Sequence, residues 1–159
     1  MTIELFLKLD GIKGESLDKA HKDEIEVLSY SWGESNPVAP GGGGGGAGKV
    51  VMQDFNFVMH VNQASPQLLL ACASGTHIKN AILAVRRGGA SPFEFLKWTL
   101  TDVLVSSYQE AGTHGDAPPT DQVSLRFGKI EVEYKTQRAN GAAGAPVKSG
   151  WNVLTNMPA

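Results

Sequence analysis

Alternation of apolar and polar side chains is the main pattern of this chain, and it predicts β-strands. From Ile3 to Leu9 every second residue is apolar, with Glu4 and Lys8 on the opposite face, and only Phe6 breaks the polar side. Further segments with strand character lie at 25–32, 49–61, 77–87, 93–108, 121–134 and 149–157. Loops rich in Gly and Pro separate many of them, so the pattern predicts about seven strands in a mostly antiparallel arrangement.

Several of these segments change the phase of their apolar residues partway along. The segment 25–32 changes phase after Val27, and in 121–134 the phase changes across Gly128. The segment 93–108 has Trp98 on one phase and Val103 on the other. Such changes indicate either bulges or strands with two apolar faces, and a second apolar face would be available for subunit contacts. Both interpretations stay open at this point.

One helix is predicted, at 65–74. Ser65 is suited to be its N-cap, Pro66 to be its first helical residue, and Gly75 lies where a helix would end. With 159 residues and 42% hydrophobic content, the chain suits a single domain spanning 1–159. The expected fold is mainly β: a compact antiparallel β-barrel of two packed sheets, flanked by this short helix.

The charge balance and the N-terminus exclude several classes of partner and location. A net charge of −2 offers no cationic excess for phosphates, so we expect neither nucleic acid nor insertion into a membrane. The first residues alternate in polarity and resemble a strand, so we expect no cleavable signal peptide. The single cysteine, Cys72, excludes a disulfide within the chain.

The glycine run at 41–48, followed by Lys49, resembles a phosphate-binding P-loop in spacing. A P-loop also needs a Ser or Thr after the lysine and a helix to receive the phosphates. Here Val50 follows Lys49 and the next segment has strand character. We therefore interpret 34–49 as a flexible Gly-rich loop.

No pattern of catalytic or metal-binding residues is present in the sequence. The four histidines, His21, His60, His77 and His114, are scattered, and no metal-binding spacing joins them. Cys72 lies within the apolar helical segment, where a buried structural role is favoured over a nucleophile. We expect no enzymatic activity, no cofactor and no metal.

The order of several motifs resembles the hemolysin-coregulated protein (Hcp) family, whose members form the tube of bacterial type VI secretion systems. The motifs are "FLKLDGIKGES", "HKDEIEVLSYSWG", "GKVVMQDFNFVMHVNQASPQLLLACASGTHIKNAILAVRR", "LTDVLVSSYQ", "VSLRFGKIEVEYKTQ" and "GWNVLTN". Together they cover nearly the whole chain. The combination of "LDGIKGES" with "ASPQLLLACASG" is not a general β-barrel pattern.

The resemblance implies a barrel that assembles into a hexameric ring with an open lumen. Rings would stack head to tail into an inner tube, with a VgrG-type spike protein at its tip and a contractile sheath around it. The lumen would act as chaperone and carrier for small effector proteins. The protein would reside in the bacterial cytoplasm before firing and then be secreted to the extracellular space or a target cell.

The resemblance also suggests roles for individual residues. For ring stacking we expect Asp10, Lys13 and Glu15 in one loop, with Glu34 and Lys49 in the Gly-rich loop, and residues 41–48 to be the least ordered part of a single ring. Gln67 and Ser74 on the helix are expected to face the lumen and its cargo, and Phe6 and Trp98 to lie in the subunit interface. Trp98 could equally be an ordinary core residue.

Two other functions remain as alternatives. One is a monomeric β-barrel that carries a small molecule in an apolar cavity. The other is a nucleotide-dependent enzyme that uses Lys49. The chain stops soon after the last predicted strand, at Ala159, so we expect no C-terminal toxin extension.

Overall fold

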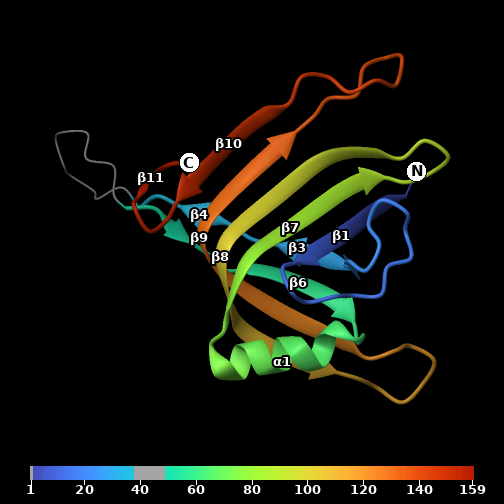
Figure 1. The fold of residues 1–159 in the computed structure, drawn as a ribbon, viewed down its shortest axis with the longest axis vertical. Helices are drawn as coiled ribbons and strands as arrows, with labels where there is room; N and C mark the ends of the chain where they lie inside the picture. The colour runs from blue at the N-terminus through green and yellow to red at the C-terminus, as the bar shows by residue number, and fades with distance from the viewer. Residues whose placement is uncertain (1, 38–48) are drawn as a thin grey trace.

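A computed structural model of the protein describes residues 2–37 and 49–159. Strands and one helix are the regular elements of this described part, and they run in the order drawn in Figure 1. The elements are β1 (Ile3–Leu9), β2 (Ile25–Glu26), β3 (Ser29–Ser31), β4 (Glu34–Ser35), β5 (Val51–Met52), β6 (Phe55–His60), α1 (Ala64–Ser74), β7 (His77–Arg87), β8 (Phe93–Ala111), β9 (Thr120–Tyr134), β10 (Val147–Asn152) and β11 (Met157–Pro158). The prediction of a mainly β chain with one short helix is confirmed.

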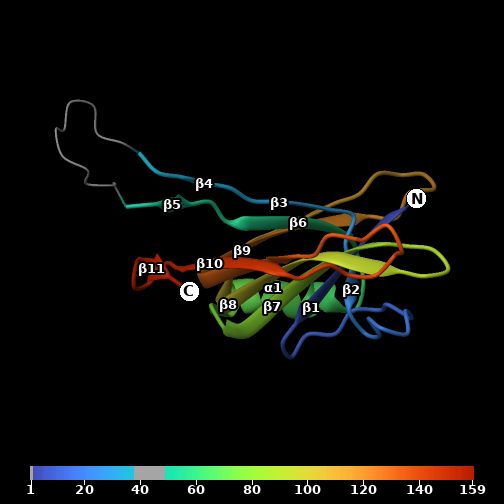
Figure 2. The ribbon, with the colours of Figure 1, turned by 90° about the horizontal axis from the view of Figure 1, so that it is seen from above.

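The main sheet has the strand order β11-β10-β9-β8-β7-β1-β2, with antiparallel pairs throughout. A branch leaves this path at β9: residues 120–125 of β9 pair with β6, which in turn pairs with β3. Residues 129–134 of β9 pair instead with β10. Figure 2 shows that β3 and β6 form a second layer beside the main sheet, and that β4 and β5 extend this layer outward.

The predicted closed β-barrel is wrong, because the strand path is open at both ends. It terminates at the two short strands β2 and β11, and β3 is joined to the sheet only through β6. The segment 25–31 explains this arrangement. Val27 donates its backbone N–H to Leu5 in β1, while Leu28 donates to Val58 in β6. The chain thus moves from one layer to the other at the predicted change of phase.

The phase changes in the long strands meet at one place in the sheet. Asp102 in β8 has a positive φ of 56° and lies beside Gly128 in β9, where both strands change their buried phase. A register shift follows between Val105 and Ser107. Residues from both phases of β8, among them Leu100 and Val103, belong to the same core. An irregular backbone, and not a second apolar face, therefore accounts for this pattern.

Helix α1 begins one residue earlier than predicted and packs against β8. Ser65 is inside the helix and not its N-cap, since the N-cap is Gln63. The side-chain oxygen of Asn62 accepts a hydrogen bond from the Ala64 N–H at 2.8 Å, which satisfies one of the free donors at this end. The end of the helix is as predicted, because Gly75 adopts φ 68° and its N–H bonds to Ala71.

The core lies between the two layers and beneath the helix. Its central side chains are less than 2% exposed, and they include Phe55, Phe57, Met59, Leu68, Leu83 and Leu125. The segment predicted as one strand at 149–157 is divided into β10 and β11 by a turn, in which Asn152 accepts a hydrogen bond from the Thr155 N–H. In the described part of the chain, no helix has the length and apolarity that a membrane crossing requires.

Candidate assembly surfaces

Phe6, predicted to lie in a subunit interface, is covered by its own chain. It points to the outer face of the sheet, where the loop at 10–24 packs over it and leaves it 4% exposed. The ring of His21 stacks on Phe6 with centroids 4.5 Å apart, and the Arg86 guanidinium lies 4.7 Å from the Phe6 ring centroid. Phe6 therefore anchors the loop to the sheet in the single subunit.

Arg86 holds the same loop through two carboxylates. Its Nε donates to Glu4 Oε2 in the neighbouring strand at 2.6 Å, and its Nη1 donates to Asp18 Oδ1 in the loop at 3.0 Å. A further bond joins Nη2 to Asp18 Oδ2. The hydrogen bonds from Arg86 lower the pKa of Asp18 to about 2, and the same contacts raise the pKa of Arg86 above its usual value.

His21 adds a second polar attachment between the loop and the sheet. Its Nδ1 lies 3.0 Å from Glu24 Oε1, and its Nε2 lies 3.4 Å from Glu94 Oε2 in β8. The loop is thus fixed at two points to different strands of the sheet. An ordered loop of this kind can present its exposed side chains in a constant position.

The candidate stacking residues lie at two separate ends of the molecule. Asp10, Lys13 and Glu15 are exposed on the loop at 10–24, and Glu15 also accepts a hydrogen bond from the Gln63 N–H at the start of α1. Glu34 and Lys49 are exposed on the β4–β5 arm, by which we mean residues 34–37 and 49–52. Figures 1 and 2 both show the arm on the opposite side of the molecule from that loop.

The arm also differs from the loop predicted at 34–49. Glu34 lies in a strand, since β4 pairs with β5 in the register Glu34 with Met52 and Ser35 with Val51. Lys49 precedes β5 and not a helix, so the context of a P-loop is missing. The expectation that residues 41–48 are the least ordered falls outside the described residues.

The helix presents the two candidate lumen residues on its exposed side. Gln67 and Ser74 are both exposed, and the Ser74 hydroxyl lies 2.6 Å from that of Thr76. The helix start is fixed to β9 by Ser65, whose hydroxyl donates to Oδ2 of the fully buried Asp121 at 2.5 Å. Burial, together with the nearby Asp121, raises the pKa of Tyr108 beside this pair to about 12.

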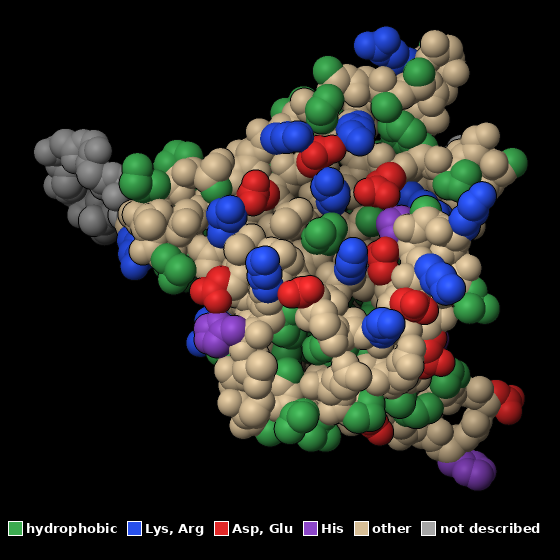
Figure 3. All heavy atoms as spheres, in the orientation of Figure 1, with side chains coloured by type: hydrophobic (Ala, Val, Ile, Leu, Met, Phe, Trp, Pro, Cys, Tyr) green, Lys and Arg blue, Asp and Glu red, His purple; other side chains and the backbone are tan. Residues whose placement is uncertain are grey.

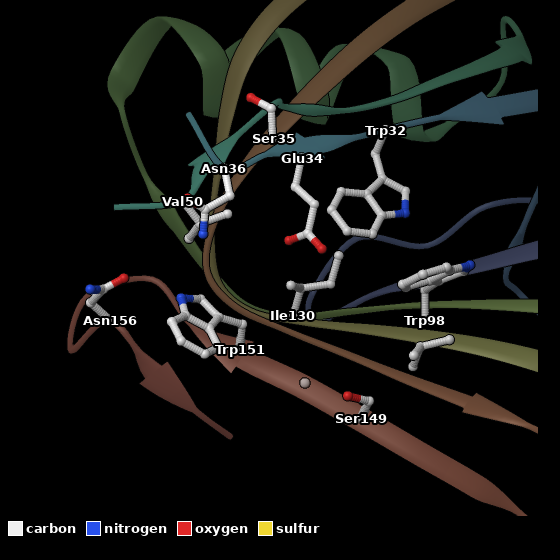
Figure 4. A pocket seen from close by; sticks show the side chains of 12 residues that line it. Trp32, Glu34, Ser35, Asn36, Val50, Trp98, Ile130, Ser149, Trp151 and Asn156 are labelled. Carbon is white, nitrogen blue, oxygen red and sulfur yellow. The ribbon is translucent and has the colours of Figure 1, made fainter. Parts of the chain in front are cut away.

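A groove of about 600 Å³ separates the β4–β5 arm from the sheet, and we call it the tryptophan groove. All three tryptophans of the chain, Trp32, Trp98 and Trp151, line it. Figure 4 shows Trp98 and Trp151 rising from the sheet below, while Trp32 and the carboxylate of Glu34 point down from the other layer. The remaining lining residues are Ser35, Asn36, Val50, Ile130, Val132, Ser149, Gly150 and Asn156.

Two of the three indoles in this groove pack against each other, and two have an N–H group without a hydrogen-bond partner among the described residues. Trp32 and Trp98 meet edge to face, with ring centroids 5.1 Å apart. The Nε1 atoms of Trp98 and Trp151 are buried and have no hydrogen-bond partner among the described residues. Trp98 is therefore neither fully buried in the core nor freely exposed. It forms part of the wall of an open groove.

The face of the sheet shown in Figure 3 carries charges of both signs in alternation. Glu133 in β9 is an example, since Lys97, Lys135 and Lys148 lie 3.8, 3.4 and 3.5 Å from its carboxylate oxygens. Burial acts to raise the pKa of Glu133, but the three lysines outweigh it and the pKa is lowered. Within residues 2–37 and 49–159, no three His, Cys, Asp or Glu side chains are placed to hold a metal ion.

Sequence reasoning missed two groups of residues that the fold brings together. Trp32 and Trp151 each lie in a motif of the family resemblance, but 119 residues separate them and no sequence pattern relates one to the other. The Arg86 contacts were missed for the same reason, since Asp18 lies 68 residues earlier. Only the presence of three tryptophans in a chain with 8% aromatic residues offered a signal.

Comparisons with known proteins agree with this architecture. The family model described as "Type VI secretion system effector, Hcp" matches residues 6–134. The chain is 44% identical to the protein hcp1 of Pseudomonas aeruginosa, over all of both chains. Among solved structures, Hcp1 from Salmonella typhimurium is 35% identical with a TM-score of 0.82 and full coverage of both chains. A structure of a type six secretion system protein is 31% identical with a TM-score of 0.92, over 99% of this chain and 100% of that one. This chain therefore belongs to the Hcp family of type VI secretion system proteins.

Proposed function

We propose that this protein is the subunit of the inner tube of a type VI secretion system. In this proposal six copies form a ring, and rings stack head to tail into a tube that sheath contraction expels. The observation that carries the proposal is the likeness to hcp1 of Pseudomonas aeruginosa along the entire chain. Hcp proteins are secreted proteins that assemble, and no enzymatic activity is indicated for the family.

Two features of the structure support head-to-tail stacking. Such stacking needs two different surfaces at opposite ends of the subunit. The loop that carries Asp10, Lys13 and Glu15 and the arm that carries Lys49 are separated in this way (Figure 1). Their exposed charged residues suit contacts that must separate again after the tube has been fired. Glu34, the other stacking candidate on the arm, lines the tryptophan groove, and a different contact is argued for it below.

The partners proposed for the assembled tube are a VgrG-type spike protein, the contractile sheath and small effector proteins held in the lumen. We assign Gln67 and Ser74 on α1 to the cargo-facing side, which their exposure permits. Trp98 remains the candidate for the subunit interface. Phe6 is better explained as an anchor for the loop at 10–24, since its own chain covers it.

The small-molecule carrier receives no support from the packing. Such a carrier needs an apolar cavity inside the monomer. Here the space between the layers is filled by side chains such as Phe55, Phe57 and Met59, which are at most 1% exposed. Nucleotide binding by Lys49 is equally unsupported. Titration of the unmodified protein with a nucleotide would revive that hypothesis only if binding were seen and were lost in Lys49→Ala.

Light scattering coupled to size-exclusion chromatography tests the proposed function. The expected mass is six times the subunit mass of 16.9 kDa, or multiples of that ring mass. Negative-stain images of the same fraction should show rings with a central hole. A protein that stays monomeric at every concentration would refute the proposal.

A further inference from the structure

We infer that the tryptophan groove of one subunit receives the β9–β10 hairpin tip of a neighbouring subunit in the same ring. By hairpin tip we mean residues 135–146, which connect β9 to β10. This inference rests on the proposed function, because it names the contact that joins neighbouring copies.

The groove has the properties of a surface that is completed by another chain. The two indole N–H groups of Trp98 and Trp151 are shielded from solvent, yet neither has an acceptor within the described residues. These N–H groups are covered by the subunit itself, so the parts of the groove that another chain can contact directly are the half-buried indole rings and the exposed Glu34 side chain. Val51 and Met157, next in sequence to two lining residues, are 54% and 60% exposed, which extends the apolar surface beyond the groove.

The hairpin tip has the complementary properties. It projects beyond the rest of the sheet at the upper right of Figure 1, and nearly all its residues are exposed. Its own backbone bonds fix its shape: the Arg138 N–H donates to Ala142 at 2.8 Å, and the Gly144 N–H donates to Thr136 at 2.6 Å. Its sequence "KTQRANGAAGAP" has small side chains, which allow backbone carbonyls to approach the indoles closely.

Charge also favours this pairing. Glu34 directs its carboxylate into the groove between the tryptophans (Figure 4), and it has no cationic partner among the described residues. Arg138 is exposed in the hairpin tip and makes no ion pair in the described part of the chain either. An arginine that enters an apolar groove can pair with a carboxylate and stack on aromatic rings.

The positions of the two surfaces require that the contact be made with another copy of the chain. The groove lies beside the β4–β5 arm, and the hairpin tip lies beyond the other end of β9 and β10, so a subunit cannot fill its own groove. A contact between two different patches is heterologous, and repeated heterologous contacts close into a ring when the rotation permits.

Tryptophan fluorescence tests occupancy directly, because every tryptophan of the chain lines the groove. Dilution through the assembly midpoint, followed in parallel by light scattering, should give a shift of emission to longer wavelength and stronger acrylamide quenching as rings dissociate. Rings that dissociate with no change in emission or quenching would overturn the inference while leaving the proposed function intact. Absence of rings at every concentration would overturn both.

Charge reversal identifies the partner segment. Glu34→Arg and Arg138→Glu should each raise the midpoint concentration for ring formation about 10-fold or more, because like charges would then meet. The double variant should recover most of that loss. The matched control is Lys79→Glu, an exposed lysine on β7 outside both surfaces, which should leave the midpoint unchanged. Single reversals that do not alter assembly, or a double variant without recovery, would refute the assignment of the hairpin tip.

Discussion

Replacing Arg86 with Met tests whether this side chain fixes the loop at 10–24 to the sheet. Arg86 is 7% exposed and joins Glu4 in β1 to Asp18 in the loop. Methionine keeps the apolar stem of the side chain but removes the charge and its hydrogen bonds. Two carboxylates would then be left close together without the cation between them, on top of the loss of the contact with Phe6.

The expected loss of unfolding free energy is intermediate between that of a buried and a surface ion pair. Breaking a buried pair costs about 3–5 kcal/mol, whereas exposed pairs contribute about 0–1 kcal/mol. The side chains of Glu4 and Asp18 are 33% and 24% exposed, so water can partly solvate both carboxylates once Arg86 is absent. We therefore expect a loss of about 2–3 kcal/mol.

Urea unfolding followed by circular dichroism measures this loss, and Arg87→Met is the matched control. Arg87 is the next residue on the same strand and lies over the Phe95 ring at 4.9 Å. Its side chain bonds to Gln137 and, among the residues that the structure describes, to no carboxylate. Its replacement should cost less than about 1 kcal/mol. Equal losses in the two variants would refute the reasoning. The comparison uses variants with the same m-value, because a changed m-value reports a change in the denatured or native state and not only in stability.

Three further predictions follow from the same structure. Because Arg86 lowers the pKa of Asp18 to about 2, the stabilisation that this ion pair gives the folded protein is complete above about pH 4 and is lost as the pH falls toward 2. The unfolding free energy should therefore fall less on acidification in Arg86→Met than in the unmodified protein. Gly14→Ala places a methyl group against the Glu24 carbonyl, so its urea midpoint should fall further than that of Gly11→Ala. A methyl group at Gly11 meets no neighbouring atom, and the only cost there is the positive φ of the backbone. Ser65→Ala removes the partner of buried Asp121 and should cost about 1–3 kcal/mol in urea unfolding, whereas the exposed Ser74→Ala should be neutral.

The parts of the fold that depend on local pattern were predictable from the sequence. Alternation from Ile3 to Leu9 and from Phe55 to Met59 identified β1 and β6, because strand side chains alternate between faces. Gly75 identified the end of α1, because that position requires a left-handed conformation. The change of phase after Val27 was also visible. Its cause, a strand segment divided between two layers, was not.

Features that depend on distant pairing could not be predicted. Whether the sheet closes into a barrel depends on which strand edges pair. One edge of β9 pairs with β6 along its first part and with β10 along its last part, and the alternation of apolar and polar residues does not specify these partners. The tryptophan groove has the same origin, since Trp32, Trp98 and Trp151 come from different strands. The candidate stacking residues were located by resemblance to a family, and the structure adds their separation into two ends.

The distribution of charge and strand edges explains why assembly would use the ends of the subunit and not the open face of its sheet. The strand path terminates at β2 and β11, which have two residues each and offer little backbone for pairing with another sheet. Beside β11, the exposed edge of β10 carries Lys148, a charge that opposes edge-to-edge pairing. On the sheet face, lysines already surround Glu133, so another copy would gain little by covering it. Apolar surface remains instead at the tryptophan groove, where the heterologous contact proposed above would limit association to a defined neighbour.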